Sequence, residues 1–235
     1  MTALFARPHG DTHVELTTAP VLESWNASTH PDQQRLNAYL DVVAAQLRLA
    51  ERPASEQWAV ELTVGLPEKQ HLDLGGRDLD NYLFPLARRL DHRRVCAAFG
   101  RKVHQAGSSI ALISATPRNK PGPPPQLRVR TSVSTESVLW KEAIHQACGD
   151  AALVSPLPSG PLALEIRFGV SSIRNWTTLW KPAIDALGPV LGLPNPEKRF
   201  SPDDDRIVDL GLHRHVDDSL GYDVDVQVWW RPTDR

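Results

Sequence analysis

The sequence predicts an α/β fold in which two similar halves, each a mixed sheet flanked by helices, form a pseudo-dimer within one chain. The first observation is a recurring order of elements. Apolar alternation and helical spacing give strand, helix, strand, helix, strand, strand before residues 117–126, and the same order after them. Residues 117–126 are rich in proline, which excludes helix and central strand and indicates a stiff linker.

The second observation is internal similarity. Residues 60–65 (VELTVG) resemble residues 164–169 (LEIRFG), and two predicted helices carry a proline at the same register, Pro85 and Pro182. A proline inside a helix costs stability, so its repetition favours a duplication. We therefore expect three segments. They are a first half at 1–116, a linker at 117–126 and a second half at 127–235.

Each element of the first half has a local reason. Pro31 suits a first helical position, and apolar residues follow it at helical spacing until Pro53 ends the pattern. The loop that ends in Gly75 and Gly76 precedes a second helix, and residues 105–107 are expected to close a hairpin. The predicted strands are 13–18, 58–64, 94–103 and 109–115, and the predicted helices are 31–52 and 79–90.

The second half repeats this organisation. Its predicted helices end near Cys148 and Leu191, and Gly149 suits the end of the first. Residues 218–221 (DSLG) are a turn signal between the last two strands. The predicted strands are 127–133, 162–170, 206–216 and 222–230. One predicted helix begins at Ser134 or Thr135 and ends at Cys148, and the other is 176–191.

Composition limits the class of protein. Hydrophobic residues make up 41% of the 235 residues, which is ordinary for a globular chain. No apolar run is long enough to cross a bilayer and the N-terminus lacks a signal-peptide pattern, so we expect a cytoplasmic protein without membrane association. Cys96 and Cys148 lie in no CxxC motif and predict two free thiols.

Charge is distributed unevenly although the net charge is only −2. Residues 77–141 carry twelve basic and four acidic side chains, whereas both flanking segments are acidic. Such a segment can supply phosphate contacts if its side chains share a face. The candidate DNA-binding residues are Arg77, Arg88, Arg89, Arg93, Arg94, Arg101 and Lys102.

Two acidic clusters carry the strongest chemical signal. Asp78 and Asp80 stand at the start of a predicted helix, where carboxylates one residue apart can converge on a cation or cap the helix. Asp203, Asp204 and Asp205 are adjacent and lead into a strand, so alternate members point to opposite faces. Their mutual repulsion favours a nearby cation, although a solvated acidic turn is also compatible with the pattern.

These clusters resemble the RusA-like Holliday junction resolvases, whose core pattern is D-x-D-N-x-x-K-x-x-x-D-x-L followed by D-D-x-x-V/I at a strand. Residues 179–187 (LWKPAIDAL) and 200–208 (FSPDDDRIV) follow that pattern, and residues 78–81 (DLDN) match its first part in the other half. The resemblance covers about 35 residues of the second half. It implies a dimeric α/β fold, Mg²⁺- or Mn²⁺-dependent phosphodiester hydrolysis and branched DNA as substrate.

The chain departs from the family pattern in both halves. The second half has Asn175 and Thr177 where the motif has aspartates, and the first half has Phe84 where the lysine belongs. Asp91 is the first half's only counterpart of the triple aspartate. One composite site is therefore expected, with Asp78, Asp80 and Lys181 as catalytic residues. The candidate metal ligands are Asp78, Asp80, Asp91, Asp203, Asp204 and Asp205.

Three functions follow as hypotheses. The first is a structure-specific endonuclease with one working site, active in DNA recombination or repair. The second is a degenerate, non-catalytic module that binds DNA or protein, with the chain acting as a monomeric pseudo-dimer. The third is a metal hydrolase using His213 and His215, which are two residues apart and share a strand face, although exposed edge residues are the simpler interpretation.

Overall fold

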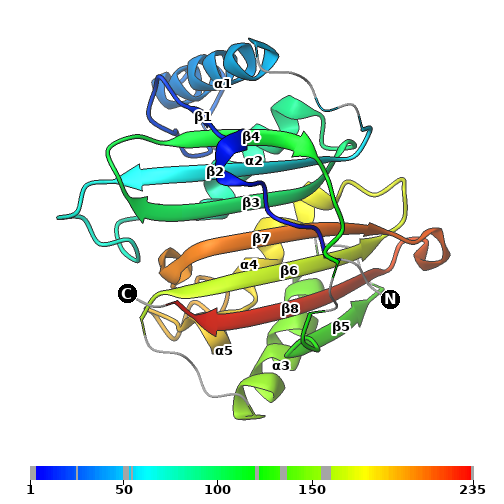
Figure 1. Ribbon diagram of the computed structural model, residues 1–235. Helices are drawn as coiled ribbons and strands as arrows, with labels where there is room; N and C mark the ends of the chain where they lie inside the picture. The colour runs from blue at the N-terminus through cyan, green and yellow to red at the C-terminus, as the bar shows by residue number, and fades with distance from the viewer. Residues whose placement is uncertain are drawn as a thin grey trace.

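One mixed eight-stranded sheet forms the centre of the protein, and helices cover one of its faces (Figure 1). The structure is a computed structural model that describes residues 4–24, 26–49, 53, 55–119, 122–132, 137–154 and 160–233. The α/β class predicted from the sequence is therefore confirmed.

The elements follow one another in nearly the predicted order. In the first half they are β1 (Val14–Glu15), α1 (Pro31–Leu49), β2 (Trp58–Leu66), α2 (Leu79–Leu90), β3 (Val95–His104) and β4 (Ser109–Ser114). The second half contains β5 (Leu127–Thr131), α3 (Val138–Val154), β6 (Leu162–Val170), α4 (Trp180–Asp185), α5 (Gly188–Leu191), β7 (Ile207–Val216) and β8 (Val224–Pro232). Residue 133, at the end of the strand predicted at 127–133, lies outside the described residues.

The strand order is β1-β4-β2-β3-β7-β6-β8-β5. Within the first half, β2 is parallel to β3 and antiparallel to β4; within the second, β6 is parallel to β7 and antiparallel to β8. The two sets of strands meet where β3 and β7 pair antiparallel, from Ala97 opposite His213 to Arg101 opposite Asp209. A single sheet thus runs through both halves.

The predicted hairpin at residues 105–107 is wrong. β3 and β4 do not pair with each other in the described sheet, because β2 lies between them. Seven of the first eight residues of β2 are buried, as expected for a central strand covered on both faces. The connection instead folds over Gly65, where an added Cβ would lie 1.9 Å from the Gly107 carbonyl oxygen.

Both repeated prolines are accommodated locally. Pro85 lies inside α2, where it cannot donate to the carbonyl of Asn81. That carbonyl accepts the backbone N–H of Glu23 instead, at 2.8 Å. Pro182 lies in the first turn of α4, where a missing N–H costs little.

The helix predicted at 176–191 is three shorter pieces. A 3₁₀ turn (Trp176–Leu179) leads into α4, and α5 begins with Gly188 and Pro189. Pro189 has no N–H to donate to the carbonyl of Asp185 four residues earlier, and its ring crowds that carbonyl, which accounts for the end of α4 at Asp185.

The second face of the sheet is crossed by the N-terminal segment (Figure 1). Phe5 packs against Ala59, Ala97 and Phe99 on this face. Gln126, at the end of the predicted linker, hydrogen-bonds both the N–H and the carbonyl of Trp230 in β8. Residues 120 and 121 of that linker lie outside the described residues.

Two expectations from composition are supported. Cys96 and Cys148 are free and buried, as predicted. Among the described residues, none of the helices has the length and apolar character needed to cross a bilayer.

Candidate metal centre

Three aspartates from two distant segments meet on the helix-covered side of the sheet. Asp78 immediately precedes α2, Asp80 lies in its first turn, and Asp204 comes from the 3₁₀ turn Asp204–Arg206 before β7. One carboxylate oxygen of each lies within 4.8 Å of the other two. The sequence predicted six aspartates as metal ligands, and the fold brings three of them together.

Asp78 does not act as a helix cap within the described part of the chain, because its side chain accepts no capping hydrogen bond. One of its oxygens accepts a hydrogen bond from the Asn81 side-chain amide at 2.9 Å. The helix N-terminus still favours negative charge here through its dipole. Asp78 and Asp80 are thus free to turn towards Asp204.

Lys181 lies at the middle of the cluster. Its Nζ is 2.6 Å from Asp204 Oδ2 and 4.0 Å from an oxygen of both Asp78 and Asp80. One helical turn further on, Asp185 lies 3.4 Å from the same Nζ. Because α4 belongs to the second half and α2 to the first, the cluster spans both halves.

Burial and charge perturb the acidic groups. Desolvation by burial raises the pKa of Asp80 to about 7, although Lys181 opposes the shift, and Asp204 and Asp78 add to it. Burial and the Asp204 charge together raise the pKa of Asp78 to about 6. Burial opposes the charge on Lys181, but Asp80, Asp204 and Asp185 outweigh it and raise its pKa above the ordinary value. The site is therefore short of positive charge.

Asp80 is the carboxylate of the cluster whose burial is least compensated, because the cation nearest to its Oδ2 among the described residues is Lys181 Nζ at 4.0 Å. Only 3% of the residue is exposed, and its Oδ2 has no hydrogen-bond partner among the described residues. An orphaned buried carboxylate oxygen is costly unless a cation or donor approaches it. Three carboxylates at this spacing offer the hard oxygen ligands that Mg²⁺ and Mn²⁺ prefer. The donor set therefore fits a divalent cation.

The other predicted ligands lie elsewhere. Asp205 is turned away from the cluster, and its two oxygens accept the backbone N–H groups of Gly76 and Arg77. Asp91 stands at the opposite end of α2, at φ 95°, and accepts the backbone N–H of Arg93 at 3.0 Å. Asp203 precedes the turn that carries Asp204 and is not one of the three grouped carboxylates.

The candidate DNA-binding residues do not share one face. Arg89 pairs with Asp41 in α1, and Arg94 lies over the ring of Trp58. Arg101 pairs with Glu61 on the second face of the sheet, whereas its neighbour Lys102 is buried on the helix side. The remaining contacts are local: Arg77 binds the Leu74 carbonyl, Arg88 lies over Phe84, and the backbone of Arg93 binds Asp91.

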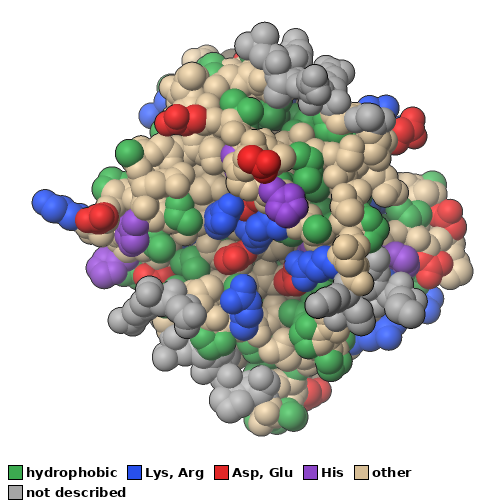
Figure 2. Space-filling view, in the orientation of Figure 1, with side chains coloured by type: hydrophobic (Ala, Val, Ile, Leu, Met, Phe, Trp, Pro, Cys, Tyr) green, Lys and Arg blue, Asp and Glu red, His purple; other side chains and the backbone are tan. Residues whose placement is uncertain are grey.

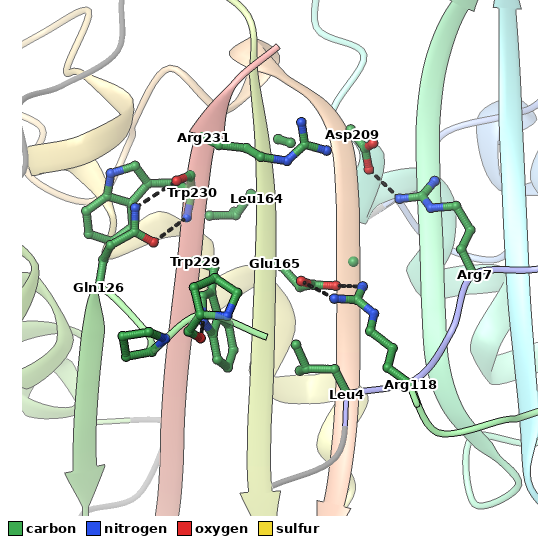
Figure 3. Close-up of a pocket in the computed structure, with 14 residues that line it drawn as sticks. Leu4, Arg7, Arg118, Gln126, Leu164, Glu165, Asp209, Trp229, Trp230 and Arg231 are labelled. Atoms are coloured by element: carbon green, nitrogen blue, oxygen red, sulfur yellow. Dashed lines mark hydrogen bonds and ion pairs between the residues drawn. The ribbon is translucent and has the colours of Figure 1, made fainter. Parts of the chain in front are cut away.

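The second face holds a separate pocket of about 550 Å³ (Figure 3). Basic and acidic side chains are interspersed over the middle of this face (Figure 2). In the pocket, Arg118 pairs with Glu165 and Arg7 pairs with Asp209, so these charges satisfy one another. This pairing distinguishes the pocket from the aspartate cluster, whose acidic charge exceeds its basic charge.

His213 is not an exposed edge residue. It is fully buried, its Nδ1 accepts the backbone N–H of Phe5 at 3.2 Å, and its Nε2 contacts Glu165 at 2.9 Å. Both ring nitrogens are therefore used within the fold, and neither is available to a metal. This geometry argues against the histidine-based metal hydrolase.

Sequence reasoning missed two members of the charged network. Asp185 was noted only as part of a motif, although its position four residues after Lys181 is a helical ion-pair signal. Lys141 Nζ lies 2.7 Å from Asp185 Oδ2, and nothing in the local sequence indicates this contact between α3 and α4.

Comparisons of the chain with models of known protein families and with curated protein sequences gave no match. The functional argument consequently depends on the cluster formed by Asp78, Asp80, Asp204 and Lys181.

Proposed function

We propose that this protein is a Mg²⁺-dependent phosphodiester hydrolase that cuts branched DNA at one composite site. The observation that carries the proposal is the meeting of Asp78, Asp80 and Asp204 around Lys181, with an orphaned buried oxygen on Asp80. The resemblance to RusA-like resolvases implies the same set, three aspartates and one lysine at corresponding positions.

Each residue has a distinct role in this proposal. Asp78, Asp80 and Asp204 would hold the cation, which when bound supplies Lewis-acid activation of the phosphate ester. Lys181 would face the phosphate and neutralise the negative charge that develops on it during cleavage. Burial of Asp80 excludes water from one side of the site and strengthens these electrostatic contacts.

An internal duplication is part of the proposal. The pairing of β4-β2-β3 has the same directions as that of β8-β6-β7, and β1 and β5 add to corresponding edges. Equivalent strands also carry a glutamate at the same position: Glu61 is the fourth residue of β2, and Glu165 is the fourth residue of β6. These correspondences support two RusA-like halves acting as a pseudo-dimer.

A duplicated chain with one complete site should nick. At the position that corresponds to Asp78 and Asp80, the second half carries Asn175 and Thr177. Asn175 accepts the backbone N–H and hydroxyl of Thr177, so it caps a 3₁₀ turn. Symmetric resolution of a junction needs two cuts, whereas one site supports a single nick or the removal of a flap.

A non-catalytic DNA- or protein-binding module is the second candidate. One observation favours it: Lys181 Nζ lies 2.6 Å from Asp204 Oδ2, so a lysine already neutralises one of the three clustered carboxylates. This ion pair reduces the net negative charge of the cluster, and with it the attraction of the cluster for a metal cation. In that case the chain would bind junctions through its basic side chains and leave them intact.

The test is cleavage of a synthetic four-way junction labelled in turn on each strand, with Mg²⁺ or Mn²⁺. We expect metal-dependent nicks that disappear in Asp80→Asn and fall sharply in Lys181→Ala. Asp209→Asn is the matched control, because Asp209 loses an ion pair with Arg7 on the opposite face of the sheet. Binding without cleavage would favour the second candidate, and absence of both would contradict the resemblance as a guide to function.

A further inference from the structure

The two segments that form the cluster are tied together by a residue that is not a ligand. Asp205 Oδ1 accepts the backbone N–H of Arg77 at 2.7 Å, and Asp205 Oδ2 accepts that of Gly76 at 2.6 Å. Gly76 and Arg77 directly precede Asp78, while Asp205 directly follows Asp204. One carboxylate therefore fixes the spacing between the two chain segments that supply the three clustered aspartates.

Lys102 contacts the 3₁₀ turn that contains Asp204 and Asp205. Its side chain is fully buried, and its Nζ donates to the Asp205 carbonyl at 2.9 Å and lies 3.8 Å from Asp205 Oδ1. Burying an ammonium group is costly unless it is paired and hydrogen-bonded. Lys102 is therefore a buried, hydrogen-bonded part of the structure around the cluster and not a solvated surface charge.

The contacts are specific in geometry. Two backbone N–H groups on one carboxylate are charge-assisted hydrogen bonds, which are shorter and stronger than neutral ones. Both Asp205 oxygens are therefore occupied by backbone groups, and Asp205 is not one of the three grouped carboxylates. Asp205 and Lys102 thus use their charges to fix backbone rather than to contact a ligand.

We propose that Asp205 and Lys102 are positioning residues that set the distance of Asp204 from Asp78 and Asp80, and through it the affinity for the metal. This inference rests on the proposed metal site. It changes the roles expected from the sequence, in which Asp205 was a ligand and Lys102 a DNA contact. Loss of outer groups that orient metal ligands costs about 10- to 100-fold in metal affinity.

The experiment measures Mn²⁺ binding by calorimetry together with the Mn²⁺ dependence of junction cleavage. The full-length variants are Asp205→Asn, Lys102→Met, Asp204→Asn as a ligand loss, and Asp209→Asn as a control on the opposite face. We expect Asp205→Asn and Lys102→Met to weaken Mn²⁺ binding about 10-fold or more, with cleavage recovering at high Mn²⁺. Asp204→Asn should not recover, and Asp209→Asn should match the wild type.

The outcomes separate this inference from the proposed function. Wild-type Mn²⁺ affinity in Asp205→Asn would overturn the positioning role, provided that Asp204→Asn loses the metal. If Asp204→Asn also binds Mn²⁺ and cuts normally, the proposed metal site itself is wrong. A merely structural role would lower thermal stability without recovery at high Mn²⁺. If Lys102→Met does not fold, Asp205→Asn still decides the question, because its side chain is partly exposed.

Discussion

Replacement of Asp80 by asparagine should stabilise the metal-free protein, and more so as the pH rises. Burial raises the pKa of Asp80 from 3.8 to about 7, so the folded protein keeps a proton that the unfolded chain releases near pH 4. The folded state is then penalised progressively between about pH 4 and pH 7. Asparagine resembles the protonated acid in size and removes this penalty.

The size of the expected stabilisation follows from the shift in the pKa of Asp80. Three pKa units at about 1.4 kcal/mol each correspond to about 4 kcal/mol above pH 7. The pKa of about 7 already includes the attraction of Asp80 to Lys181, so we expect the measured gain to approach about 4 kcal/mol at pH 8. Near pH 4 the gain should approach zero.

The assay is urea unfolding of wild type and Asp80→Asn between pH 4 and pH 8 in the presence of a chelator. Asp209→Asn serves as the control, and its difference from wild type should not show this rise. A difference between wild type and Asp80→Asn that stays constant with pH would refute the reasoning. A lower free energy of unfolding for Asp80→Asn at pH 8 would also refute it, because the buried, ionised carboxylate would then not destabilise the wild-type protein.

Four further predictions concern the metal centre and the core. Lys181→Ala should retain Mn²⁺ binding but lower the cleavage rate about 10²- to 10³-fold, measured under saturating metal, and loss of binding instead would make Lys181 structural. Four aspartates (78, 80, 185 and 204) and two lysines (141 and 181) form one ion-pair network with a net charge of −2, so calorimetry should find one divalent ion per chain. The affinity for that ion should rise from pH 5.5 to pH 8 as Asp78 and Asp80 lose their protons, and a pH-independent affinity would exclude them as ligands. Trp176→Phe should lower the free energy of unfolding by about 2 to 4 kcal/mol in urea, because Trp176 is fully buried and donates to the Val95 carbonyl at 3.0 Å; half-buried Trp229→Phe is the comparison and should cost less.

The fold was largely predictable where a local pattern decides it. The helix at 79–90 matches α2 at both ends, because apolar spacing and the preceding glycines define it. The pairing of strands was not predictable in the same way. β3 and β4 are adjacent in sequence and the loop between them is rich in turn residues, yet β2, which is buried on both faces, lies between them.

The same distinction between local patterns and contacts distant in sequence applies to the candidate metal centre. Motif spacing identified Asp78, Asp80 and Lys181 as candidates, and the structure brings them together. Three adjacent aspartates cannot be distinguished by sequence, because a 3₁₀ turn rather than strand alternation decides that Asp204 faces inward. Alignment of the two halves matches Asp91 with the triple aspartate, but Asp91 and Asp78 lie at opposite ends of α2.

The antiparallel junction between β3 and β7 has a consequence for any attempt to divide the chain. Separated at the linker, each half would expose one of these strands as an unpaired edge, and such edges readily pair with another copy. A pair of first halves would contain Asp78 and Asp80 without Lys181, and a pair of second halves the reverse. Both homotypic pairs should be inert, and only the mixed pair should restore cleavage, as in complementation of a split enzyme.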